Sequence, residues 1–210
     1  GKSTTLRMIA GLEDISSGEL WIGDKMVNDV EPKDRDIAMV FQNYALYPHM
    51  SVYDNMAFGL KLRKVPKEKI DKQVHEAAKI LDIEHLLDRK PKALSGGQRQ
   101  VVTLLMCTLS IPKLLLLDEH TAALDPATAE KVMDITKTIV QENNITTMMI
   151  THNLKQSLTT GTRTIMLDSG EIILDLSGEE RKNTTMEDMI KMYSMKKQKE
   201  FDNDRILLSQ

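Results

Sequence analysis

The sequence contains a single cysteine, few aromatic residues and no excess of basic side chains. Cys107 has no second cysteine with which to pair, which excludes an internal disulfide framework and suits a reducing compartment. Because Cys107 lies in an apolar run, we expect a buried and unreactive thiol. The formal net charge of −3 gives no basic footprint, so nucleic acid is not expected as a partner. No stretch approaches the roughly 18 uninterrupted apolar residues that a membrane-spanning helix requires.

The length and composition are those of an ordinary globular protein. The 210 residues are enough for one α/β domain with a small appended subdomain. Hydrophobic residues make up 41% of the chain and charged residues 28%, close to the usual values. The chain begins at Gly1 without an initiator methionine, at a point where a longer motif would be ending. We therefore expect a fragment of a longer protein.

The most informative stretch is residues 93–100, which read Ala-Leu-Ser-Gly-Gly-Gln-Arg-Gln. Locally this is a helix start, because Ser95 can cap the helix and Gln98 can close a capping box. Capping does not explain Gly96 and Gly97, since a glycine in a helix costs about 1 kcal/mol relative to alanine. Glycines at this position let a phosphate group approach bare N–H groups at the positive end of the helix. These residues alone leave both interpretations open.

The first residues have the composition of the end of a phosphate-binding loop. Gly1, Lys2, Ser3 and Thr4 match the last positions of the motif G-x-x-x-x-G-K-[ST] and its continuation into a helix. In such a loop the backbone N–H groups and Lys2 contact phosphate oxygens, and the Ser3 hydroxyl binds Mg²⁺. Because so short a motif is common by chance, a Ser/Thr-capped helix with a surface lysine is the alternative.

Three short apolar runs predict the strands of a buried sheet. They are Ile37–Phe41, Leu114–Leu117 and Ile145–Thr151. Each is followed by a polar residue, at the edge where α/β sheets place their ligands. These residues are Gln42, Asp118 and His152. A glutamine or histidine at a strand end is more often structural, so Gln42 and His152 need a nearby nucleotide or metal to gain a functional interpretation.

Asp118 and Glu119 stand together at the end of a strand of four leucines. Ionised carboxylates at the mouth of a buried strand are costly unless they are paired or bound to a metal. Asp118 is placed to hold Mg²⁺. Glu119 is one residue further on and could polarise an attacking water molecule. A strand end without chemistry is the alternative.

The segment from residue 51 to residue 94 is expected to be mostly helical. Ser51 can cap a helix over Val52–Lys61, and Pro66 stands at the start of a second helix over Lys67–Leu81. Four of the eight aromatic residues gather over Tyr44–Phe58. This cluster is either ordinary core or, in part, an exposed docking patch.

Further along the chain, Asp125 and Pro126 predict the start of a helix that runs to about Glu142. Capping alone explains Asp125. The segments Thr164–Leu167 and Glu171–Leu174 predict a hairpin near the end of the fold.

In this combination and order, the motifs resemble those of the ATP-binding subunits of ABC transporters, over Gly1 to about Ser177. Other P-loop enzymes share the phosphate loop and the acidic strand, but not the sequence L-S-G-G-Q between them. The resemblance implies an α/β P-loop NTPase fold of the ABC ATPase type. This fold has a mostly parallel core sheet flanked by helices, with an inserted α-helical subdomain. The resemblance also implies ATP hydrolysis as the activity, with ATP and Mg²⁺ as cofactors.

The resemblance gives each candidate residue the role of its matching position. The end of the Walker A loop matches Gly1, Lys2, Ser3 and Thr4. The Q-loop glutamine matches Gln42, and the Walker B aspartate matches Asp118. The catalytic glutamate matches Glu119, and the switch histidine matches His152. Glu119, His152 and Gln42 would carry catalysis, and Ser3, Gln42 and Asp118 would hold Mg²⁺. In this family two subunits pair head to tail. Ser95, Gly96, Gly97 and Gln98 would then cover the γ-phosphate bound to the partner subunit, with Asp125 in the D-loop at the same interface.

The same resemblance implies a domain organisation and a set of partners. The core would comprise residues 1–42 and 95–178, the helical subdomain residues 43–94, and a C-terminal helix and polar tail residues 179–210. Integral membrane permease subunits would dock near Tyr44–Phe58. The chain would be a peripheral subunit on the cytoplasmic face of the cell membrane, powering solute import as a dimer.

Several departures from the family pattern carry expectations of their own. His120 stands where the family usually has proline, and Ala122 where it often has serine. The elements that stack the adenine would precede Gly1, so we expect the chain as given to bind ATP poorly. Residues 35–100 are similar to oligosaccharide-importer ATPases of the maltose type, whereas the residues after Gln100 are more similar to small ATPases of amino-acid or tryptophan importers. We hypothesise a recombinant or misassembled join within residues 94–100.

Two other functions remain open from the sequence. One is a soluble ABC-family ATPase that acts on DNA or the ribosome and not in transport. The other is an inactive fragment or chimera of two transporter ATPases. The transported solute cannot be read from this chain, because membrane and binding subunits determine it.

Overall fold

A computed structural model describes residues 1–41 and 45–207, with side chains described as far as residue 196. Gln42 and Tyr44, which the sequence singled out, lie outside the described residues. The chain divides into two compact units, Ser3–Ile150 and Gly1–Lys2 with Thr151–Gln210. None of the described helices is both long enough and apolar enough to cross a membrane.

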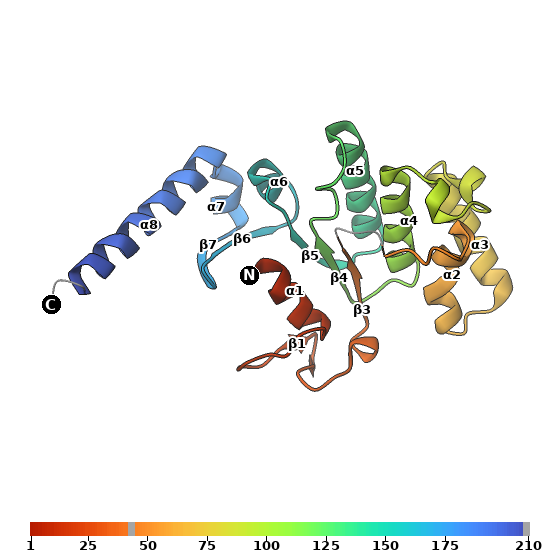
Figure 1. Ribbon diagram of the computed structural model, residues 1–210, viewed down its shortest axis with the longest axis horizontal. Helices are drawn as coiled ribbons and strands as arrows, with labels where there is room; N and C mark the ends of the chain where they lie inside the picture. The colour runs from red at the N-terminus through yellow and green to blue at the C-terminus, as the bar shows by residue number, and fades with distance from the viewer. Residues whose placement is uncertain (42–44, 208–210) are drawn as a thin grey trace. The chain divides into compact units, whose positions relative to one another are not determined.

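The first 150 residues contain five helices and five strands among the described residues, with three short 3₁₀ turns (Figure 1). The helices are α1 (Lys2–Ala10), α2 (Val52–Leu62), α3 (Lys67–Ile80), α4 (Gly96–Thr108) and α5 (Pro126–Glu142). The strands are β1 (Trp21–Ile22), β2 (Lys25–Met26), β3 (Ile37–Val40), β4 (Leu114–Asp118) and β5 (Thr146–Ile150). The 3₁₀ turns are η1 (Pro32–Asp34), η2 (Glu84–Leu86) and η3 (Pro91–Ala93).

The central sheet is parallel, with β4 between β3 and β5. The alternation of the four leucines in β4 explains why helices cover both of its faces. Leu114 and Leu116 pack in the cluster that contains Leu6 and Ala10 of α1. The other two leucines pack with side chains of α4 and α5. This arrangement confirms the predicted α/β class with a mostly parallel sheet flanked by helices.

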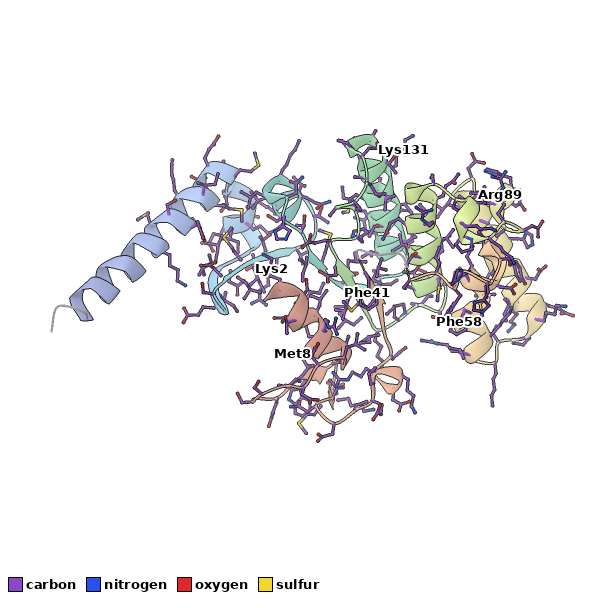
Figure 2. The ribbon with its side chains drawn as sticks, in the orientation of Figure 1. Lys2, Met8, Phe41, Phe58, Arg89 and Lys131 are labelled. Carbon is purple, nitrogen blue, oxygen red and sulfur yellow. The ribbon has the colours of Figure 1, made fainter. Side chains whose placement is uncertain are left out.

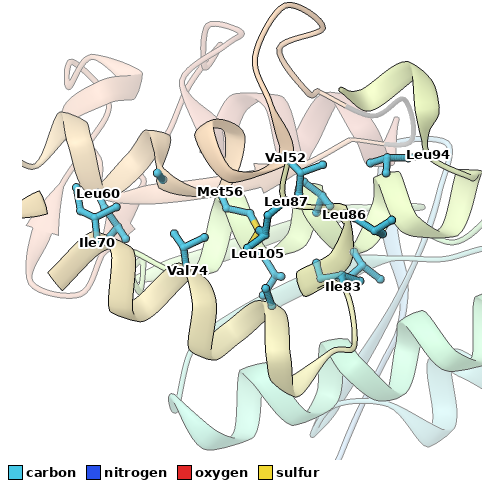
Figure 3. Close-up of a cluster of buried hydrophobic side chains, with 14 of the residues drawn as sticks. Val52, Met56, Leu60, Ile70, Val74, Ile83, Leu86, Leu87, Leu94 and Leu105 are labelled. Carbon is cyan, nitrogen blue, oxygen red and sulfur yellow. The ribbon is translucent and has the colours of Figure 1, made fainter. Parts of the chain in front are cut away.

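A second apolar cluster lies among α2, α3, η2 and the start of α4 (Figure 3). Ser51 caps α2 as predicted, because its side chain accepts a hydrogen bond from Asp54 N at 3.0 Å. α3 begins directly after Pro66, also as predicted. The two helices end within one residue of the positions expected from the sequence. Periodic apolar residues and helix-start signals were sufficient here because both are local.

The smaller unit is built on the hairpin of β6 (Arg163–Asp168) and β7 (Glu171–Ser177). Ser169 and Gly170 form the turn with φ of 50° and 90°, as a tight hairpin turn requires. The predicted hairpin is confirmed, with longer strands than expected. Three helices complete the unit: α6 (Leu154–Thr159), α7 (Gly178–Asn183) and α8 (Met186–Leu207). The sequence did not predict α6 or α7, since six residues are too few to show a helical period.

Candidate functional site

The end of the phosphate-loop sequence and the end of the acidic strand meet in the larger unit. Ser3 Oγ donates a hydrogen bond to Asp118 Oδ1 at 3.0 Å. The two residues approach because Leu6 and Ala10, further along α1, pack with Leu116 of β4. A hydroxyl and a carboxylate are the oxygen donors that Mg²⁺ takes in phosphate-binding sites. Ser3 and Asp118 therefore have both the chemistry and the proximity for one ion.

The other predicted nucleotide-contacting residues are divided between the two units. Thr4 is exposed in the first turn of α1, and Gly1 is exposed immediately before that helix. The first N–H groups of a helix have no partner within the helix and carry its positive dipole. Lys2 and the exposed His152 belong to the smaller unit (Figure 2 labels Lys2). Gln42 lies outside the described residues.

Glu119 follows the strand in an unusual backbone conformation, with φ of 49°. Its N–H still donates to the Ile150 carbonyl at 3.1 Å, as if β4 continued for one more residue. Its carbonyl accepts from Ala122 N at 2.9 Å and so begins a turn. A left-handed backbone costs a non-glycine residue on the order of 1 kcal/mol and is common at functional sites. No pattern in the sequence predicts it, because glutamate has no preference for this conformation.

His120 is buried behind this turn, with 3% of its surface exposed. Its Nε2 lies 3.2 Å from Thr136 Oγ1, and that hydroxyl itself donates to the Val132 carbonyl at 2.7 Å. The Thr136 oxygen must therefore accept from His120 Nε2–H. Burial lowers the pKa of His120 to about 4, so the ring is neutral at physiological pH. His120 thus fills a packing position that joins the post-strand turn to α5.

The capping box predicted for the L-S-G-G-Q stretch is confirmed. Gln98 N donates to Ser95 Oγ at 3.2 Å, and Ser95 N donates to Gln98 Oε1 at 2.9 Å. Both side chains therefore serve the start of α4 in this structure. Gly96 is half-buried in the first turn.

Gly97 has a packing reason for being glycine that the sequence did not reveal. A Cβ at this position would come well inside 3.0 Å of Thr128 Cγ2 on α5. The first turns of α4 and α5 therefore touch at Gly97. Thr128 N is also the group that Asp125 caps, through Asp125 Oδ1 at 3.1 Å, as predicted. A side-chain hydrogen bond with Thr128 is the main cause of the lowered pKa of Asp125, and the backbone N–H bond adds to it.

Gln100 is a further residue that the sequence did not single out. Its side chain is fully buried, and neither its Nε2 nor its Oε1 has a hydrogen-bond partner in the described structure. An unpaired buried amide is costly, on the order of 1–3 kcal/mol. It lies two residues after Gln98, on the same helix as the predicted phosphate-contacting segment.

Over its described residues, 45–58, the segment that holds the aromatic cluster is partly core and partly surface. Met56 is fully buried. Tyr47 and Phe58 are half-buried, with ring centroids 4.6 Å apart. Tyr53 is half-buried on the same helix as Phe58, and its hydroxyl donates to Asp71 at 3.2 Å. The half-buried aromatic side chains form the part of this cluster that a partner could reach.

Comparison with known proteins gives a consistent result. The family model described as ABC transporter matches residues 1–122. The oligosaccharides import ATP-binding protein MsmX of Bacillus subtilis is 56% identical over 172 residues, which is 82% of this chain and 47% of MsmX. The maltose/maltodextrin import ATP-binding protein MalK of Vibrio vulnificus is 50% identical over 170 residues, 81% of this chain and 46% of MalK. The chain thus spans about half the length of these curated relatives.

A solved structure agrees with the sequence matches. The ATP-binding cassette MJ0796, determined as a dimer in a post-hydrolysis state bound to ADP and Pi, has a TM-score of 0.73 and 31% identity. The alignment covers 84% of this chain and 80% of that one. The match to MsmX covers 82% of the chain and so must run through residues 94–100, where we placed a join. The similarity to oligosaccharide importers is confirmed, and a different origin for the second half stays a hypothesis.

Proposed function

This chain belongs to the ABC transporter family, and on that premise we propose that it is the ATP-binding and ATP-hydrolysing subunit of a solute importer. The names of the relatives support import, since MsmX and MalK are named as import ATP-binding proteins for sugars. They also favour a sugar as the solute. We propose a peripheral position on the cytoplasmic face of the membrane, beneath two permease subunits that dock near residues 44–58.

One observation supports catalysis more than any other. Ser3 Oγ and Asp118 Oδ1 lie 3.0 Å apart, and Glu119 is the next residue along the chain. Mg²⁺ bound by Ser3 and Asp118 would neutralise charge on the phosphates. Gln42 is proposed as a further ligand. Ser3 and Asp118 fit one ion in chemistry and proximity, since their oxygens already lie within hydrogen-bond distance of each other.

The remaining residues would act on the phosphates and the attacking water. Lys2 and the first N–H groups of α1 would bind the phosphate oxygens. Glu119 would accept a proton from water as it attacks the γ-phosphate, and His152 would contact the γ-phosphate. In a head-to-tail dimer, the Ser95–Gln98 segment of the partner subunit would cover the same phosphate. Asp125 would lie at that interface.

The test is a charge-neutral substitution in the complete gene product. Glu119→Gln should bind ATP with an affinity close to that of the wild type and lower turnover at least 100-fold. Glu130→Gln is the matched control, because Glu130 is an exposed acid on α5. Unchanged turnover in Glu119→Gln would refute the role of Glu119. Absent ATP binding in the wild type would favour an inactive fragment or chimera.

Copurification separates the transport function from the soluble alternative. We expect the wild-type protein to copurify from solubilised membranes with integral membrane proteins. Recovery with ribosomes or DNA, and without membrane proteins, would favour the soluble ABC ATPase.

A further inference from the structure

Asn55 is a fully buried polar residue at the start of α2, for which the sequence predicted no role of its own. Its Oδ1 accepts a hydrogen bond from Tyr47 N at 2.8 Å, and its Nδ2 donates to the Tyr47 carbonyl at 3.1 Å. Nδ2 also lies 2.9 Å from the Ser51 carbonyl. One amide thus holds both backbone groups of Tyr47, five residues after Gln42 in the chain. Buried amides satisfied at both ends fix a single backbone arrangement.

The same helical turn holds a second segment through its backbone. The first N–H groups of a helix lack partners within the helix and need other acceptors. Val52 N donates to the Arg89 carbonyl at 2.8 Å, and Tyr53 N donates to the Leu87 carbonyl at 2.9 Å. Arg89 and Phe58, both labelled in Figure 2, belong to this helical part of the chain. Leu87 and Arg89 precede Ser95 by eight and six residues.

Apolar packing reinforces this connection. Val52 is fully buried in the cluster that includes Leu87 and Leu94 (Figure 3). Leu94 immediately precedes the helix cap Ser95. The first turn of α2 is therefore joined to the segment after Gln42 through Asn55, and to the segment before Ser95 through Val52 and Tyr53.

We propose that this turn is the joint that couples the permease-docking surface to the nucleotide-contacting segments, and that Asn55 is its positioning residue. The inference rests on the proposed function. Tyr47 belongs both to the joint and to the docking surface, because its ring packs against Phe58. A membrane subunit that displaces Tyr47 therefore shifts the first turn of α2. Movement of this helical turn then shifts the segment that leads to Ser95.

The first test measures exchange of single backbone amides in the complete gene product. Asn55→Ala removes the clamp, and we expect exchange to rise about tenfold or more at Tyr47 N. Because the joint is shared, exchange at Val52 N and Tyr53 N should rise together with it. The amides of β4 should change less than twofold. Tyr53→Phe is the matched control in the same turn, since it removes only the exposed hydroxyl bond to Asp71.

Two exchange results would overturn the proposal. Faster exchange at Tyr47 alone would show a local anchor without a connection to the second segment. An equal rise in β4 would show general destabilisation. If Asn55→Ala does not fold, Asn55→Asp keeps the acceptor for Tyr47 N and loses the donor to its carbonyl, and the same comparison applies.

The second test uses the complex with its copurified membrane subunits. In Asn55→Ala, stimulation of ATP hydrolysis by these subunits should fall at least fivefold, while hydrolysis by the isolated subunit stays within twofold of the wild type. Full stimulation in this variant would contradict the joint. A wild-type protein without ATPase activity or membrane partners would instead count against the proposed function, and the exchange experiment would still decide whether the joint exists.

Discussion

Substitution of Gly97 by alanine tests whether close packing of α4 on α5 fixes the start of α4. The added Cβ would lie well inside 3.0 Å of Thr128 Cγ2, whereas two carbon atoms in contact need about 3.5–4.0 Å. Relieving such an overlap in a packed interface costs about 1–3 kcal/mol. Alanine recovers up to about 1 kcal/mol through its higher helix propensity. We therefore expect Gly97→Ala to lower the free energy of unfolding by about 1–2 kcal/mol.

A double substitution identifies the cause. Thr128→Ser removes Cγ2 but keeps the N–H group that Asp125 caps. In urea denaturation, the combination of Gly97→Ala with Thr128→Ser should recover most of the lost stability, which is a non-additive result expected of contacting residues. Unchanged stability of Gly97→Ala, or no recovery in the double variant, would refute the packing explanation.

The double variant also separates packing from phosphate recognition. If Gly97 serves packing alone, ATP hydrolysis returns together with stability. If the partner's phosphate also needs the space beside this N–H group, stability returns and hydrolysis does not. The proposed dimer predicts the second outcome.

Three further predictions follow from buried groups. Gln100→Met replaces an unpaired buried amide with an apolar side chain of similar size. In urea denaturation it should raise the free energy of unfolding by about 1–2 kcal/mol. A loss of stability would show that the amide is paired in solution. For His120, the pKa in the folded protein is about 4, below the ordinary 6.5. As the pH falls, the unfolded chain therefore binds the proton before the folded chain does. The free energy of unfolding should fall by at most about 3 kcal/mol as the pH drops from about 6.5 towards 4. His120→Gln should flatten the dependence of urea midpoints between pH 6.5 and 5, and a flat wild-type profile would contradict it. Cys107 is half-buried, so the expected buried thiol is found only in part. Burial of the thiol raises its pKa to about 12, so at neutral pH a thiol reagent should label the folded protein much more slowly than the denatured chain, and equal rates would be the contrary result.

The features that the sequence predicted correctly are local or periodic. The Ser95–Gln98 capping box spans four residues, and the Asp125 cap spans four as well. The leucines of β4 signalled a strand buried on both faces because they leave no polar side for solvent. The parallel order of β3, β4 and β5 was also predictable, because helices connect successive strands and such crossovers join parallel strands. The approach of Ser3 to Asp118 is not local, since 115 residues separate them. It was expected only from the family resemblance, which assigns both residues to one Mg²⁺.

The features that the sequence did not predict depend on contacts between separate elements. The reason for Gly97 is a methyl group 31 residues later in the chain, on another helix. In the sequence, Asn55 cannot be told from any other asparagine in a helix. Only the structure shows that its side chain binds the backbone of Tyr47. The left-handed conformation of Glu119 has no local signal either. Such positions are defined by tertiary geometry, so a single sequence contains no pattern for them.

The measurement that tests the central claim most directly is the ATP-dependent association of the Glu119→Gln variant, followed by sedimentation. A subunit that binds ATP between its own phosphate loop and the Ser95–Gln98 segment of a second copy should be a monomer without nucleotide and a dimer with saturating ATP and Mg²⁺. Ser95→Arg in the same background should remain monomeric. A Glu119→Gln protein that binds ATP yet stays monomeric at every concentration would contradict the head-to-tail dimer.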